Sequence, residues 1–111
     1  MPQEYYFKEG CYIQEWHNTE SDVECSIAHV RVEAKQTTRL HALKGTQERY
    51  VILAGQARVT VGKKSWLVKP KDVVLIEPDT AQKIENLSDD DLLFLAICTP
   101  RFEKQNYYEV S

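Results

Sequence analysis

The stretch RLHALKGTQERYVILAG, from Arg39 to Gly55, contains side chains that could do chemistry. His41 precedes Glu48 by seven residues, and an apolar run closed by a glycine follows. An imidazole and a carboxylate together suit a divalent transition metal, and they also suit general acid–base catalysis. Two interpretations of the stretch alone stay open: a metal site that lacks a ligand, or a pair of strands whose polar residues serve packing and solubility.

The segments around this stretch alternate between apolar and polar residues, which is the pattern of β-strands. In CSIAHVRVE, the side chains from Ile27 to Val32 fall on opposite faces in turn. ERYVILAGQARVTVG predicts two strands joined by a hairpin turn at residues 54–56, and LLFLAICT predicts a central strand buried on both faces. About nine such short strands predict an all-β sandwich or small barrel, with a helical turn only in KQNYYEV near the C-terminus.

The composition fits one ordinary globular domain, residues 1–111. The chain is 42% hydrophobic and 28% charged, which argues against disorder. A net charge of −3, with acids and bases interleaved, provides no binding surface for nucleic acid, and no apolar run is long enough to span a membrane. Three widely spaced cysteines and the lack of a visible secretory signal predict a reduced, cytoplasmic protein.

Two longer segments carry motifs. TTRLHALKGTQERYVILAGQARVTVG has a histidine, a later glutamate and an apolar strand that ends in glycine. VKPKDVVLIEPDTAQKIENLSDDDLLFLAICTP has a proline turn, a glutamine, an asparagine four residues later and a following apolar strand. Together they resemble the two motifs of the cupin superfamily, His-x-His followed by Glu, and then His followed by Asn. The resemblance implies an antiparallel jelly-roll (cupin-type) barrel.

The match is partial at the positions that bind metal in cupins. His41 matches the first histidine of the pair, Glu48 the acidic ligand and Asn86 the asparagine. Leu43 stands where the second histidine belongs, and Gln82 replaces the third. The resemblance therefore implies that His41, Glu48 and Gln82 hold a divalent metal, with Fe, Ni, Zn and Mn as candidates. Because two imidazoles are missing, a pocket without metal stays open.

Alternation directs these side chains toward one shared interior. Glu48 and Tyr50 fall on the same side of one predicted strand, and Arg39 lies two residues before His41, which should place it on the same side. We expect His41 and Glu48 to be the catalytic residues, and Arg39 and Tyr50 to bind the substrate. A guanidinium there would pair with a carboxylate or phosphate, and a surface ion pair is the alternative. A second neighbouring carboxylate is not evident in the interior.

Several functions therefore stay open. The first is a metal-dependent enzyme of oxygenase, isomerase or epimerase type that acts on a small polar metabolite. Without a metal, His41 and Glu48 would serve as an acid–base pair. The second is a non-catalytic barrel that binds a small acid or sugar, and the third is a structural role. By analogy with small cupins we expect a homodimer, with CYIQEW supplying an exchanged or paired strand.

Overall fold

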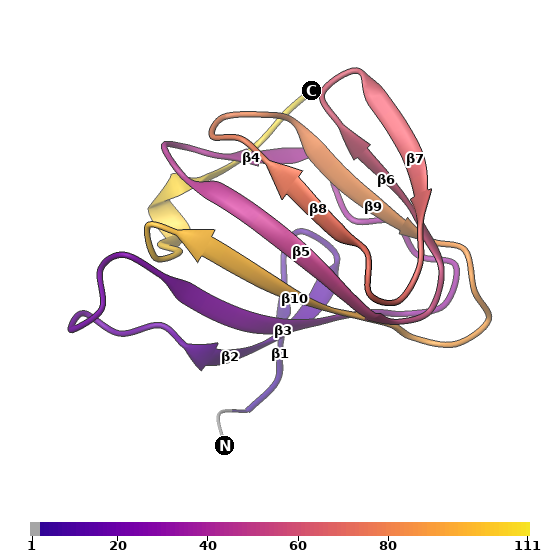
Figure 1. Cartoon of the computed structure of the whole chain (residues 1–111), viewed down its shortest axis with the longest axis horizontal. Coiled ribbons are helices and arrows are strands. Elements are labelled where there is room, and N and C mark those ends of the chain that lie inside the picture. The colour runs from indigo at the N-terminus through magenta and orange to yellow at the C-terminus, as the bar shows by residue number, and fades with distance from the viewer. Residues whose placement is uncertain (1–2) are drawn as a thin grey trace.

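A computed structural model describes residues 3–111, and its strands form two antiparallel sheets (Figure 1). The six-stranded sheet contains, in spatial order, β1 (Tyr5–Phe7), β2 (Cys11–His17), β3 (Ser26–Val32), β10 (Leu92–Thr99), β5 (Gln47–Ala54) and β8 (Val73–Ile76). The five-stranded sheet contains β11 (Tyr107–Glu109), β4 (His41–Leu43), β9 (Gln82–Asn86), β6 (Ala57–Val61) and β7 (Lys64–Val68). The all-β, jelly-roll prediction is confirmed.

Two strands lie outside the predicted nine, at the two ends of the chain. β1 and β11 have three residues each, which is too short for alternation to be visible. The helical turn predicted near the C-terminus is present as η1 (Lys104–Asn106), a 3-10 helix that leads into β11. In the part of the chain that the structure describes, no helix is long and apolar enough to cross a membrane.

The core fills the space between the sheets with the inward side chains of each strand. On β5, Glu48, Tyr50 and Ile52 are buried, and the Tyr50 ring packs on Phe94 of β10 at a centroid distance of 4.5 Å. β10 is central, as predicted, since it pairs with both β3 and β5. It is not buried on both faces: its outward side chains, such as Leu95, stay partly exposed because the five-stranded sheet covers only one side.

The turn at residues 54–56 is correctly placed, but it does not form a hairpin. β5 belongs to the six-stranded sheet and β6 to the five-stranded sheet, so the turn carries the chain from one sheet to the other. Gly55 has a φ of +95°, and a Cβ there would lie 3.3 Å from the Cα of Leu92. Glycine therefore permits both the turn and the close approach of β10. Alternation within two strands does not reveal which sheet the second one joins.

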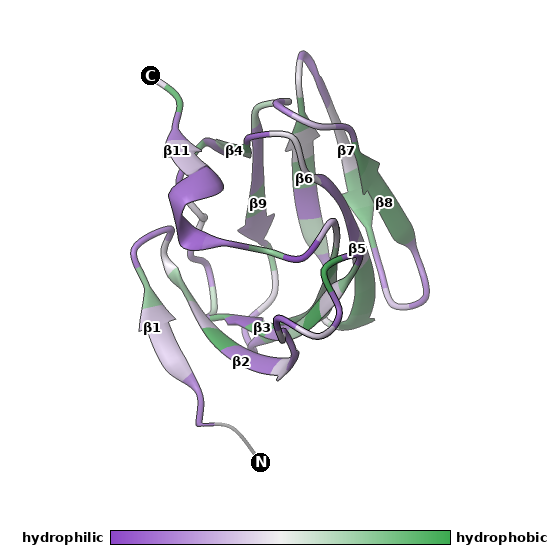
Figure 2. Cartoon of the chain, turned by 90° about the vertical axis from the view of Figure 1, so that its left-hand side faces the viewer, coloured by the Kyte–Doolittle hydropathy of each residue, from purple (hydrophilic) through white to green (hydrophobic). Residues whose placement is uncertain are grey.

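The outer face of the six-stranded sheet is apolar near β8. Val73 and Leu75 of β8 are 59% and 48% exposed, and Leu53 of β5 is 42% exposed. Figure 2 shows β8 coloured as hydrophobic along its length. Neighbouring exposed side chains of this kind often mark an interaction surface.

Asn86 ties the end of β9 to two loops. Its Nδ2 donates to the carbonyl oxygens of Val32 (3.0 Å), Glu33 (3.2 Å) and Asp90 (2.8 Å). Its Oδ1 accepts hydrogen bonds from the backbone N–H of Ser88 (2.9 Å) and from the Ser88 hydroxyl (2.6 Å). The asparagine of the second motif therefore has a structural role in this chain.

Replacing Asn86 by alanine is expected to lower the free energy of unfolding by roughly 3 kcal/mol, because it leaves several buried polar groups without partners. Urea unfolding followed by circular dichroism measures the change. Gln36→Ala is the control, since the Gln36 side chain is exposed and its removal should cost less than about 0.5 kcal/mol. Equal stability of Asn86→Ala and the wild type would contradict the assignment.

Candidate functional site

A cavity of about 40 Å³ opens between the two sheets. Its walls are mostly apolar and aromatic, and polar side chains from several segments of the chain converge in it. These polar residues are Tyr5, Glu9, Glu15, Asn18, Ser26, His41, Glu48 and Tyr50. An apolar cavity with a few converging polar groups is the usual form of a small-molecule site.

His41 is the first residue of β4 and is buried at the cavity wall. Its Nδ1 lies 2.7 Å from the backbone oxygen of Arg39. A carbonyl oxygen can only accept, so Nδ1 carries the hydrogen and the neutral ring keeps its lone pair on Nε2. Burial lowers the pKa of His41, which favours this neutral form. The imidazole is thus held as a proton acceptor.

Glu48 lies on β5 and is 7% exposed. Its Oε2 accepts a hydrogen bond from Sγ of Cys98 at 3.7 Å, while its Oε1 has no hydrogen-bond partner among the described residues. Burial raises the pKa of Glu48 to about 7, and the charge of Glu9 adds to the increase. Burial also raises the pKa of the Cys98 thiol, so this sulfur stays protonated and is no nucleophile near neutral pH.

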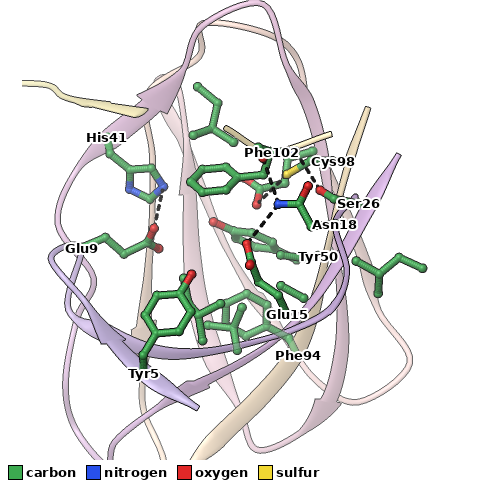
Figure 3. A pocket seen from close by; sticks show the side chains of 17 residues that line it. Tyr5, Glu9, Glu15, Asn18, Ser26, His41, Tyr50, Phe94, Cys98 and Phe102 are labelled. Atoms are coloured by element: carbon green, nitrogen blue, oxygen red, sulfur yellow. Dashed lines mark hydrogen bonds and ion pairs between the residues drawn. The ribbon is translucent and has the colours of Figure 1, made fainter. Parts of the chain in front are cut away.

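Glu9 supplies the second carboxylate that the sequence did not reveal. It lies in the turn between β1 and β2, and its Oε1 is 3.7 Å from Nε2 of His41 (Figure 3). Its side chain is 12% exposed, and burial raises its pKa to about 7. The backbone N–H of Arg39 donates to the carbonyl oxygen of Glu9 at 2.7 Å, which brings this turn beside β4. The expectation of a single interior carboxylate was therefore wrong.

Tyr50 and Gln82 form a pair next to Glu48. The Tyr50 hydroxyl donates to Oε1 of Gln82, and burial raises the pKa of Tyr50 far above its usual range. The Tyr50 ring lines the cavity, whereas Gln82 is fully buried and is not part of the lining. Gln82 is the register partner of His41 across β4 and β9, and its side chain lowers the pKa of Glu48. It therefore supports the two residues that reach the cavity.

Arg39 does not reach the cavity through its side chain. The guanidinium is 64% exposed and lies 4.0 Å from the carboxylate of Glu109. Residues 38–40 precede β4 and are not part of a strand, so alternation counted back from His41 does not apply to them. Arg39 acts on the site through its backbone instead, because its N–H holds Glu9 and its carbonyl holds His41.

A hydrogen-bonded group lines part of the cavity. Nδ2 of Asn18 donates to Oε1 of Glu15 at 3.0 Å and to the carbonyl oxygen of Phe102 at 2.9 Å. Nε of Arg101 donates to Oδ1 of Asn18 at 2.8 Å. These contacts fix the position of Glu15, and Figure 3 shows the two hydrogen bonds of Asn18 as dashed lines.

The donor atoms do not fit the metal set that the resemblance implies. The oxygen of Gln82 already accepts the Tyr50 hydroxyl, and Glu48 and His41 alone leave most positions of a metal unfilled. Within residues 3–111, no three or more His, Cys, Asp or Glu side chains are grouped so that they could hold a metal ion. The cavity holds the largely buried carboxyls of Glu9 and Glu48 together with one imidazole, that of His41.

The sequence is similar to a known protein family and to a protein of an archaeon. Residues 28–98 match the family model described as Cupin domain. An uncharacterised protein of Methanocaldococcus jannaschii, MJ1618, is 31% identical over 104 residues, which cover 92% of this chain and 83% of the relative.

Solved structures of two enzymes are also similar. Pac13 of Streptomyces, a nucleoside dehydratase, aligns with a TM-score of 0.81 at 15% identity, over 97% of this chain and 83% of its own. Bacillus subtilis oxalate decarboxylase, which has Mn(II) centres, aligns with a TM-score of 0.83 at 23% identity over 97% of this chain. This chain covers 30% of that larger protein. At these identities the likeness shows the fold alone.

Proposed function

This chain belongs to the cupin domain family, and we propose that residues 1–111 form a single-domain enzyme that transfers protons on a small polar metabolite without a metal. One observation carries the proposal. An imidazole with a free Nε2 and two carboxyls whose pKa values are about 7 share one apolar cavity. Groups that titrate near the working pH are the most effective general acids and bases.

Each of these groups has its own role in the proposed reaction. Nε2 of His41 is the base that removes a proton from a carbon of the substrate. Glu48, which is close to half protonated at neutral pH because its pKa is about 7, is the acid that returns a proton to the substrate. Glu9, 3.7 Å from Nε2, stabilises the imidazolium that forms. Removal and return of one proton is the chemistry of an isomerase or epimerase.

The structural relatives support an enzymatic role. A nucleoside dehydratase and an oxalate decarboxylase are both built on this fold. Neither activity is carried over to this chain, because a fold hosts many chemistries and the residues of the site decide among them.

Exchange of carbon-bound hydrogen for deuterium tests the proposal without a known substrate. Small amino, hydroxy and keto metabolites are incubated with the protein in D₂O, and proton NMR follows the loss of carbon–hydrogen signals. We expect exchange with protein that was purified without a histidine tag, treated with a chelator and shown to contain far less than one metal per chain.

Two other outcomes of this test would contradict the proposal, and each would support a different function. If the chelator-treated protein catalyses exchange only after Fe, Ni, Zn or Mn is added, His41, Glu48 and Gln82 would be metal ligands. Binding of an acid or sugar without any exchange would support the non-catalytic barrel.

We also propose a homodimer, formed through the apolar outer face of the six-stranded sheet. The expected exchange of CYIQEW between chains is not needed, since β2 pairs with β1 and β3 of its own chain. Leu53, Val73 and Leu75 supply an exposed apolar surface instead. Light scattering is expected to give twice the chain mass of 12.9 kDa. Leu75→Asp is expected to give the monomer, and a monomeric wild type would contradict the proposal.

The proposed location is the cytoplasm. Cys11, Cys25 and Cys98 are all free thiols. Free thiols are usual where the cell keeps cysteine reduced.

A further inference from the structure

We propose that the cavity selects a small organic cation, an alkylammonium group, over an acid of the same size. The inference rests on the proposed function only in taking the same cavity as the ligand site. It narrows the substrate to a metabolite that carries an amine.

The charges that line the cavity have one sign. Glu9, Glu15 and Glu48 contribute carboxyl groups, and none of the described lining residues is a lysine or arginine. His41 is the one basic side chain in that lining, and burial lowers its pKa, so it adds no positive charge near neutral pH. An anionic ligand would therefore face carboxylates without a compensating cation.

One oxygen atom of these carboxyls has no hydrogen-bond donor among the described residues. Oε1 of Glu48 is buried in the cavity wall and has no partner in the described part of the chain. A buried acceptor without a donor is costly, and a ligand that donates an N–H removes the cost. A charged N–H forms the stronger bond to a carboxylate.

Three cationic side chains near the cavity already interact with other residues of the chain. Arg101 donates to Asn18 and to Glu103 at 3.1 Å. Lys8 lies over the ring of Tyr107 at 4.9 Å, and Lys104 over the ring of Tyr5 at 5.4 Å. None of the three is part of the lining, so the positive charge that the cavity lacks has to come with the ligand.

The walls and the volume suit an ammonium head with a short carbon chain. Phe94 and Phe102 also line the cavity, and aromatic rings attract cations. A volume of about 40 Å³ is enough for a few atoms beyond a single water, which needs about 10–15 Å³. The cavity is partly open to solvent, which leaves room for the remainder of the ligand.

Three small molecules with the same four-carbon length test whether the cavity prefers a cation. n-Butylamine, 1-butanol and butyrate are titrated at equal ionic strength into ¹⁵N-labelled protein at about pH 8, where both carboxyls with a pKa of about 7 are mostly ionised. Amide shift changes at cavity residues such as Tyr50 and Cys98 report binding. We expect butylamine to bind at least about tenfold more tightly than butanol, and butyrate to bind more weakly still.

Glutamate-to-glutamine variants, which keep the shape of the side chain, test whether butylamine binds in this cavity. Glu48→Gln is expected to weaken butylamine binding by about tenfold or more, and Glu9→Gln gives a second test if the first variant is unstable. Glu24→Gln is the matched control, because Glu24 is exposed and outside the cavity. Butyrate binding as tightly as butylamine, or unchanged butylamine binding in both cavity variants, overturns the inference. Deuterium exchange is measured separately, so cation binding without exchange would contradict only the proposed function.

Discussion

Replacing His41 by alanine is expected to slow carbon–hydrogen exchange by about 10²- to 10⁴-fold, because the variant loses the base that receives the proton. The imidazole has one free nitrogen, Nε2, since Nδ1 donates to the carbonyl oxygen of Arg39. The measurement is the initial rate of signal loss in D₂O at saturating substrate. Added imidazole is expected to restore part of the rate, because it can enter the space that the side chain leaves.

His29→Ala is the matched control for this prediction. His29 lies on β3, outside the cavity, and stacks on Trp16 with a centroid distance of 5.5 Å. Its removal is expected to leave exchange near the wild-type rate. An unchanged rate in His41→Ala, or the same loss in both variants, would show that His41 is not the base.

Raising the pH from about 4.5 to about 8 is expected to weaken the fold through Glu9 and Glu48. Their folded pKa values of about 7 lie above the ordinary value of 4.5, so the folded state binds more protons than the unfolded state between these values. Stability is then fully present below about pH 4.5 and is lost as the pH rises through 7. Each carboxyl contributes on the order of 3 kcal/mol, less where the two interact.

Glu48→Gln isolates this effect, since the amide cannot ionise. Relative to the wild type, the variant is expected to be more stable at about pH 8, by up to roughly 3 kcal/mol, and to lose this advantage toward pH 4.5. Urea unfolding at a series of pH values measures both curves, with exposed Glu24→Gln as the control. Parallel curves for the wild type and Glu48→Gln would mean that Glu48 titrates as an ordinary glutamate.

Within a strand, the alternation of apolar and polar residues predicts which side chains point inward. Within β5 the two-residue period places Glu48 and Tyr50 inward together, as the structure has them. The same reasoning fails for Arg39, because the strand begins at His41 and the period does not extend beyond its end. It also gives no information on Glu9, which lies in a turn. A backbone hydrogen bond from Arg39, thirty positions away, sets the place of Glu9.

Gln82 shows a second limit of sequence reasoning. Motif comparison identifies the position that faces the interior, but not the partner that the new side chain takes. Here the amide oxygen accepts the Tyr50 hydroxyl, an interaction between β9 and β5 in different sheets. The loss of two motif imidazoles thus coincides with a hydrogen-bonded pair behind the cavity and a second carboxyl, Glu9, inside it.

The proposed function depends on two carboxyls with raised pKa values that share the cavity with a neutral imidazole. Carbon-13 NMR of protein labelled at the glutamate carboxyls, titrated after chelator treatment, measures these pKa values directly. We expect two resonances with midpoints near pH 7, one of which disappears in Glu48→Gln and the other in Glu9→Gln. If every glutamate carboxyl titrates near its ordinary value of 4.5, the cavity holds no acid–base pair and the proposed function fails.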